Sequence, residues 1–508
     1  MVRHGKLSKG CQTCRKRKIK CDQSSPSCSQ CRKAGWVCPQ YGDSVGRMFQ
    51  YHDPSRFSTD QRGLSQDIDH AATSLQRMNG HSTPHNADHY SIPGYTVPNE
   101  IKQSLNDRAI NYFLITNAFR DDAGLRGFYE YLPTYNMRTD KEVLTSLTAA
   151  ALAAYGNRLR DRDLLKRARV YYGRSLRLVN RALESPMNAV RNSTMVSILL
   201  LNTFEGLTSE GPRSMAYSDG HVRGVMMVMK LRGQSLMDTR QGQQIFLHMC
   251  RCLITYCTIR PARVPADVII LRKHACKHLD TKDPAWMLDE MMIKLANLRA
   301  GVHDGEFPNH RSIIDLAVEL DGELSLLSND MHVAWGFGKC KPPESGSHLP
   351  TYHHFYPDLW VAYIWNYIHT CRLLLQGEIR DQLAQLSATS PSLSMEIHGR
   401  WVQSRQIMQR LISDICASVP QYRDRLSTTE IEQHGDGLGI SKGGSNPVPT
   451  VAGVYFLLWP LLVAGEMTEC STERIWIINQ CRLLGETTGI QRMITVADRL
   501  HHGGEALL

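Results

Sequence analysis

Six cysteines near the amino terminus form the chemically most specific pattern in the chain. They are Cys11, Cys14, Cys21, Cys28, Cys31 and Cys38, and the second three repeat the first three with an offset of 17 positions. One tetrahedral zinc ion uses four thiolates, whereas two zinc ions need eight zinc–sulfur bonds. Six cysteines supply eight bonds when two of them bridge both ions. The repeat therefore predicts that all six cysteines bind two Zn²⁺ ions, with the equivalent residues Cys11 and Cys28 as the bridges.

Basic residues surround these cysteines. Residues 1–41 hold ten Lys or Arg and one acid, Asp22. The whole chain has 59 basic and 49 acidic residues, so the remainder has 49 basic and 48 acidic residues and is nearly neutral. Between Cys14 and Cys21 five of the six residues are basic. A dense positive unit favours a polyphosphate partner, because each neutralised phosphate releases counterions. We therefore expect the first half of the repeat to face nucleic acid.

The spacing C-x2-C-x6-C-x6-C-x2-C-x6-C, with the basic run and with Pro26 in the central loop, resembles the fungal binuclear zinc cluster (Zn2Cys6) transcription factors. The resemblance implies a nuclear regulator of RNA polymerase II transcription that reads GC-rich, CGG-like half-sites in double-stranded DNA. Transcription machinery or coregulators would be further partners, and a metabolic or secondary-metabolite gene set a typical target.

The same resemblance assigns roles to single residues. A short helix after Cys11 is expected to end near Lys18, and in this family that end of the helix enters the major groove. Lys18 would then contact guanine, while phosphates would be contacted by Gln12, Arg15, Lys16, Arg17 and Lys20. These phosphate contacts set the orientation of the module more than its sequence preference.

Other interpretations of the cysteine region compete with this one. A disulfide framework is disfavoured because the opening MVRHGKLSKG has no apolar signal core and nine further cysteines are scattered through the chain. The basic run is also typical of a nuclear import signal, a role that the same residues can share with DNA binding. Metal storage would not need one basic half. The main alternative is a helical enzyme or scaffold whose zinc module contacts protein or RNA.

The rest of the chain divides into a polar segment and a large apolar one. Residues 42–97 have the composition of a flexible linker. Within it, apolar residues step by four and three over residues 64–78, which predicts a short amphipathic or coiled-coil helix that would support a homodimer; they are Leu64, Ile68, Ala71, Leu75 and Met78. From residue 98 to 508, helical periods dominate.

These periods predict a large all-α domain of stacked antiparallel helices, with loops at residues 336–357 and 426–447. Asp163 is expected to cap the first strongly periodic helix. Apolar repeats predict helices over residues 163–183, 186–204, 221–233, 241–259, 285–300, 312–327, 359–375, 395–419, 451–467, 473–484 and 490–501. The apolar stretch at 451–464 contains Pro460 and has only fourteen residues, so we expect a buried helix and no membrane span.

One segment of this domain, HVRGVMMVMKLRG at residues 221–233, resembles the regulatory domain of fungal transcription factors, often called the middle homology region. The resemblance implies a domain that receives a signal or a partner. No HExxH or GxxxxGK[ST] motif occurs, and the glycine-rich segment at 434–445, which includes GISKG, lacks the flanking strand and helix that a catalytic motif of this kind requires, so we expect no enzyme. The methionines of this domain are interpreted as core residues, with a pocket for a small-molecule effector as the alternative.

Overall fold

The computed structural model describes residues 13–14, 17, 19–22, 24, 27–36, 38, 104–118, 126, 128–135, 139–208, 214–331, 335–341, 349–389, 394–424 and 451–503. The chain separates into two compact units, Met1–Tyr51 and His52–Leu508. The helix predicted at 64–78 and the loop predicted at 426–447 lie outside the described residues.

Helices make up almost all of the described regular structure. The first unit contains α2 (Ser29–Lys33). The first part of the second unit contains α4 (Leu105–Asn117), η5 (Leu132–Thr134), α5 (Lys141–Leu159), α6 (Arg162–Leu183), α7 (Pro186–Ala189), α8 (Asn192–Thr208), α9 (Ser214–Arg232), η6 (Gly233–Asp238), α10 (Arg240–Ile259) and α11 (Ala266–Ala275). The remainder contains α12 (Pro284–His303), α13 (His310–Asn329), β1 (Gly338–Cys340), β2 (His353–Phe355), α14 (Leu359–Thr389), α15 (Ser394–Asp424), α16 (Val451–Met467), α17 (Ser471–Thr488) and α18 (Gln491–His502).

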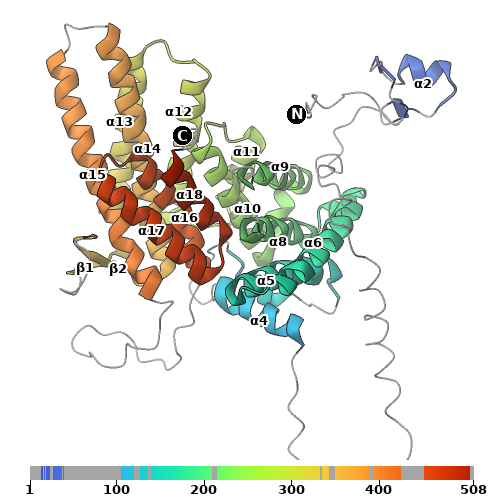
Figure 1. Ribbon diagram of the computed structural model, residues 1–508. Coiled ribbons are helices and arrows are strands. Elements are labelled where there is room, and N and C mark those ends of the chain that lie inside the picture. The colour runs from blue at the N-terminus through green and yellow to red at the C-terminus, as the bar shows by residue number, and fades with distance from the viewer. Residues whose placement is uncertain are drawn as a thin grey trace, which may run out of the picture. The chain divides into compact units, whose positions relative to one another are not determined.

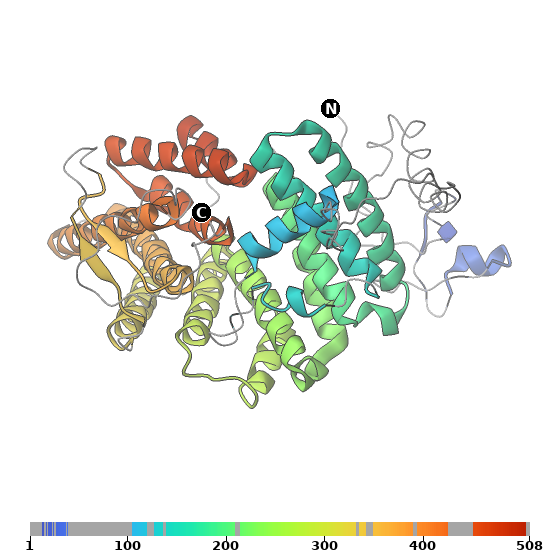
Figure 2. The same cartoon turned by 90° about the horizontal axis from the view of Figure 1, so that it is seen from below.

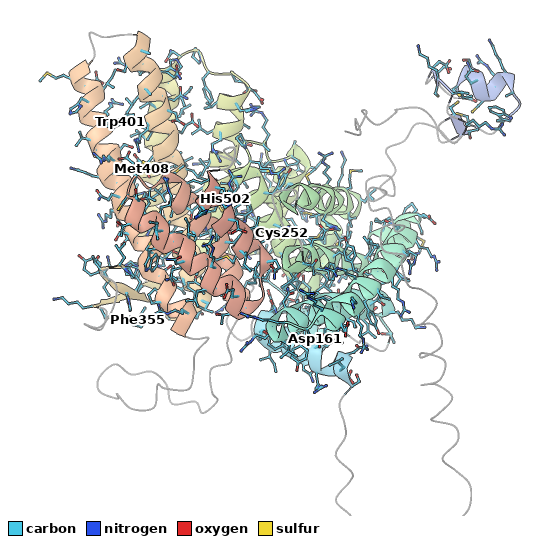
Figure 3. The ribbon with its side chains drawn as sticks, viewed as in Figure 1. Asp161, Cys252, Phe355, Trp401, Met408 and His502 are labelled. Atoms are coloured by element: carbon cyan, nitrogen blue, oxygen red, sulfur yellow. The ribbon has the colours of Figure 1, made fainter. Side chains whose placement is uncertain are left out.

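Helix α6 shows how the apolar period produces an element. Its buried residues include Leu164, Ala168 and Tyr172 on one face, as the period of the sequence predicts. The capping residue is Asp161 rather than the predicted Asp163. The Asp161 carboxylate accepts hydrogen bonds from the amides of Asp163 (2.8 Å) and Leu164 (3.1 Å), which have no partner inside the helix. Figure 3 labels Asp161 where α5 passes into α6.

Helix α5 was not among the predicted helices, and its surroundings explain why. Most of its residues from Val143 to Asn157 are buried. It packs against α4, α6, α8 and α17, so neighbours surround it and no apolar stripe alternates with a polar one. Alanine-rich composition then permits close packing on several sides. A buried helix of this kind has no periodic signal in the sequence.

Most helices of the second unit pack against helices that are near in the chain, and the last two, α17 and α18, also pack against the early helices α5 and α8. Figure 1 shows α13, α14 and α15 side by side, and α14 also packs against α12 and α16. In Figure 2 the red carboxy-terminal helices reach the teal helices, in agreement with contacts of α17 with α5 and of α18 with α8. The side-chain amide of Asn157 joins these ends, because it donates to the carbonyls of Leu207 and Gly489, both at 2.7 Å.

The predicted loop at 336–357 is partly wrong. Strands β1 and β2 pair antiparallel within it, with Gly338 opposite Phe355 and Cys340 opposite His353. Three-residue strands are too short for an alternating pattern to identify them in a sequence. Figure 3 labels Phe355 on this hairpin. Within its described residues the second unit is therefore helical with one small hairpin, and none of the helices described there is long and apolar enough to span a membrane.

Candidate zinc centre

The second half of the cysteine repeat is built around the short helix α2. Cys28 is its N-cap, and the Cys28 Sγ accepts a hydrogen bond from the Cys31 amide at 3.4 Å. The helix ends with Arg32 and Lys33 in its last turn, where cations interact favourably with the helix dipole. Gly35 follows with a φ of +65°, a conformation that glycine adopts without strain. The chain can then turn back toward the cysteines.

Backbone hydrogen bonds repeat with the same offset as the cysteines. In the first half, the amide of Arg17 donates to the Thr13 carbonyl at 3.2 Å, and the amide of Ile19 donates to the Cys14 carbonyl at 3.0 Å. In the second half, the corresponding bonds run from Ala34 to Gln30 at 3.2 Å and from Trp36 to Cys31 at 2.8 Å. The offset in the sequence is therefore a repeat of local structure.

The described thiols of the two halves converge. The Sγ atoms of Cys14, Cys28 and Cys31 lie within 4.8 Å of one another, and all three residues are fully buried. Cys28 belongs to a second group of the same size, with Cys21 and Asp22. Cys38 packs against the buried cysteines. Cys28 is thus the residue that both groups share, as a bridging ligand must be.

The spacing of these thiols suits zinc. Two thiolates at about 2.3 Å from one tetrahedral ion lie about 3.8 Å apart. The Cys14 and Cys28 Sγ atoms are separated by 3.6 Å. Burial opposes ionisation of Cys28, but hydrogen bonds from the Cys31 amide and from the thiols of Cys31, Cys14 and Cys21 outweigh it and lower the pKa of Cys28 to about 6. A thiol that ionises near neutral pH is prepared to bind a metal.

Asp22, the single acid of this region, holds the start of α2. Its Oδ1 accepts a hydrogen bond from the Ser29 amide at 3.0 Å, and its Oδ2 accepts one from the Ser24 hydroxyl at 2.8 Å. Hydrogen bonds from Ser29 and then from Ser24 keep the pKa of Asp22 below its usual value. Sequence analysis assigned Asp22 no role. Its position as the one acid among ten basic residues was the available signal.

Trp36 is a second residue that sequence analysis missed. Its ring packs against the buried cysteines, and the Arg17 guanidinium carbon lies 3.9 Å from its centroid. Arg17 and Lys20 are both exposed. The other residues predicted to bind zinc or DNA lie outside the described part of the chain; they are Cys11, Gln12, Arg15, Lys16 and Lys18.

Residues 9–47 match the family model of the fungal Zn(2)-Cys(6) binuclear cluster domain. This domain binds two zinc ions, and the buried thiols described above fit such a site. It belongs to fungal transcription regulators that bind DNA and act in the nucleus. No curated protein and no solved structure matches the chain.

Proposed function

We propose that this zinc cluster regulator reads GC-rich, CGG-like half-sites in duplex DNA, with the first half of the cysteine repeat on the DNA. The observation that supports this most is a difference in charge between two halves that share a backbone pattern. The halves begin alike, because Arg15 and Lys16 correspond to Arg32 and Lys33. The next four residues, 17–20, are RKIK in the first half, whereas residues 34–37 are AGWV.

The residue proposed to read the bases is Lys18. Its counterpart is Gly35, which has no side chain and lies in the turn after α2. The second half therefore offers no cation at this position of the repeat. An ammonium group donates well to the O6 and N7 acceptors that guanine presents in the major groove. A lysine at this position in one half alone would confine base recognition to that half.

The proposed phosphate contacts flank Lys18 in the sequence; they are Gln12, Arg15, Lys16, Arg17 and Lys20. Among them, Arg17 and Lys20 belong to the described residues, and both are exposed to solvent. Each cation that neutralises a phosphate releases counterions, so DNA binding should weaken steeply with salt. The compact cysteine centre, with Cys11 and Cys28 as the proposed bridges of two zinc ions, would supply the rigidity that such a small unit needs.

We further propose that residues 98–508 form a regulatory domain that receives a signal and modulates transcription. Its most recognisable segment, residues 221–233, begins with a core residue. His221 is buried, and its Nε2 lies 2.8 Å from the Glu205 Oε1 on α8. The same carboxylate oxygen accepts a hydrogen bond from the Tyr172 hydroxyl at 2.5 Å. The segment thus ties α9 to α8 and α6, as expected of a residue pattern that specifies packing.

The partners of this domain belong to the same proposal. Coregulators, the transcription machinery or a small-molecule effector would bind it, and a metabolic or secondary-metabolite gene set would be controlled. The segment at 64–78 would form a homodimer, so that two modules bind two half-sites. Light scattering would measure the oligomeric state of the full chain. A variant with Leu64 and Leu75 changed to Asp is the comparison. A monomeric wild-type protein would contradict the proposed homodimer.

Selection from a random duplex pool tests the DNA-binding proposal. The full chain loaded with zinc should enrich GC-rich sites, and Lys18→Ala should weaken the selected complex at least tenfold. The matched control is Lys33→Ala, which removes an equal charge from the second half and should change the affinity less than threefold. Absence of enrichment by the wild-type protein would contradict the proposal and would favour a module that contacts protein or RNA.

A further inference from the structure

The contact between Arg17 and Trp36 crosses from one half of the cysteine repeat to the other. The guanidinium carbon lies 3.9 Å from the centroid of the indole, the distance of a close stack. Arg17 is exposed, whereas Trp36 is half-buried and packs against the buried cysteines. A charged side chain at the surface is therefore held by a ring that the metal module itself fixes.

Both partners have anchored backbones. The Trp36 amide donates to the Cys31 carbonyl at 2.8 Å, directly after the turn at Gly35. The Arg17 amide donates to the Thr13 carbonyl at 3.2 Å. The contact thus joins two residues whose main chains are already tied to the cysteine segments, so it restricts the arginine side chain relative to the whole module.

The contact also breaks the internal repeat. With the offset of 17 positions, the counterpart of Trp36 is Ile19 and the counterpart of Arg17 is Ala34. The second half therefore supplies a ring where the first half has an aliphatic residue, and the first half supplies a cation where the second half has a methyl group. Two backbone hydrogen bonds correspond between the halves, so the shared backbone pattern forms with either set of side chains.

Stacking leaves the arginine able to bind an anion. A guanidinium group is planar, and its five N–H donors point outward in that plane. An indole on one face uses none of these donors, whereas it limits the orientations of the plane. An arginine held in this way can donate two parallel hydrogen bonds to a phosphate with less loss of side-chain freedom on binding.

We propose that Trp36 is a positioning residue of the DNA interface, which holds the Arg17 guanidinium with its donor edge toward a phosphate. The inference rests on the proposed function of the first half of the repeat. It adds a residue from the second half that touches no DNA and acts through Arg17. The proposal requires that the effects of changing the two residues on DNA affinity depend on each other.

The experiment is a double-mutant cycle in the full chain loaded with zinc. Dissociation constants for a duplex taken from the selection are measured over a range of NaCl concentrations, together with bound zinc. Arg17→Ala should weaken binding about fivefold and reduce the slope of log affinity against log salt by about 0.9, the value for one phosphate. Trp36→Leu, which keeps an apolar side chain against the cysteines, should weaken binding about threefold with both zinc ions retained.

Two comparisons separate positioning from a general loss of structure. Trp36→Phe keeps an aromatic face and should bind within about twofold of the wild type. In the Arg17→Ala background, Trp36→Leu should have no further effect, because the residue it positions is absent. In the Arg32→Ala background, which removes an exposed cation of the second half, Trp36→Leu should still weaken binding about threefold.

Several outcomes would overturn the proposal. Full additivity of the Arg17 and Trp36 changes would show that the indole acts independently of the arginine. Equal weakening by Trp36→Phe and Trp36→Leu would exclude the aromatic face as the cause. Loss of zinc from Trp36→Leu alone would assign the ring to the metal centre instead. Failure of the wild-type protein to select DNA would refute the proposed function itself, and so is distinguishable from all three.

Discussion

The Sγ atoms of Cys14 and Cys28 lie 3.6 Å apart although fourteen positions separate the two residues in the chain. The contact joins the two halves of the cysteine repeat. Because Cys28 is also grouped with Cys21, it stands where one thiolate can serve two metal ions. The bridging role that the sequence repeat predicts therefore leads to an experiment on zinc content.

Removal of a bridging thiolate should affect both ions, whereas removal of a terminal ligand should affect one. We expect Cys28→Ala to bind less than about 0.3 zinc per chain, and Cys38→Ala to keep about one, since each ion needs four ligands. Zinc bound per chain, measured by mass spectrometry under native conditions, checks this. Cys340→Ala, at an exposed cysteine of β1, should retain two. Equal zinc content in Cys28→Ala and Cys38→Ala would contradict the bridge.

Asp289 compensates two buried arginines in the helical unit. The Asp289 Oδ2 lies 3.6 Å from the Arg251 Nε and 3.4 Å from the Arg272 Nη1, and all three side chains are nearly inaccessible to solvent. Asp289→Ala leaves two buried cations with less compensation, which typically reduces the free energy of unfolding by about 3–5 kcal/mol. Chemical denaturation of the full chain measures this change.

The control is an ion pair at the surface. The Lys294 Nζ lies 2.5 Å from the Glu323 Oε2, but the Lys294 side chain is exposed and the Glu323 side chain is partly exposed. Solvent screens such a pair, so Glu323→Ala should change the free energy of unfolding by less than about 1 kcal/mol. A similar loss in both variants would show that burial does not distinguish the two interactions.

Gly489 must be a glycine for two separate reasons. Its φ is +78°, and a Cβ at this position would overlap the Asn157 side chain and come within 3.0 Å of the Asn157 carbonyl carbon. Gly503 has a similar φ of +62° but open space around it. Gly503→Ala should therefore lower the free energy of unfolding by only about 1–2 kcal/mol, the contribution of holding a residue with a Cβ in the left-handed backbone conformation.

Gly489→Ala should lower the free energy of unfolding by at least about 2 kcal/mol more than Gly503→Ala does, because α5 and α17 must also move apart. Thermal unfolding of both variants gives the comparison. Equal destabilisation by the two changes would contradict this prediction, because it would mean that the contact between Gly489 and Asn157 accommodates a Cβ without loss of stability.

Buried histidines should make the helical unit sensitive to acid. Burial, followed by repulsion from Arg251, lowers the pKa of His248 to about 3, and the ring accepts or donates a hydrogen bond at 2.8 Å with the Tyr131 hydroxyl. Burial likewise lowers the pKa of His369 to about 3. An unfolded histidine has a pKa near 6.5. Between these values the unfolded state binds more protons, so stability is complete above pH 6.5 and declines as the pH falls toward 3.

The slope of this decline approaches about 1.4 kcal/mol per pH unit for each such histidine. His248→Gln keeps a neutral polar side chain and should remove one histidine's share of the slope between pH 6.5 and pH 4.5. His303→Gln is the control, because His303 is 70% exposed. Denaturation midpoints measured across this pH range give the pH dependence of stability for each variant. An unchanged slope in His248→Gln would contradict the attribution of this share of the slope to His248.

The zinc module and many of the helices could be predicted from the sequence because the signals that indicate them are local. The six cysteine spacings, the basic run and the apolar period of α6 each depend on residues less than about 30 positions apart. Helices with one exposed face, such as α6 and α13, were predicted with nearly correct bounds. Helix α5 was not, because a helix covered on several sides has no polar face to reveal its period.

Sequence alone determined that the amino-terminal residues form a two-zinc cysteine module with a basic half, and that the rest is largely helical, because spacing and periodicity are properties of neighbouring residues. Tertiary structure alone decided which side chains from different segments meet. The stack of Arg17 on Trp36 and the hydrogen bond from Asn157 to Gly489, 332 positions apart, are of this kind. Such contacts depend on how elements pack, and many different pairs of residues satisfy the same local patterns.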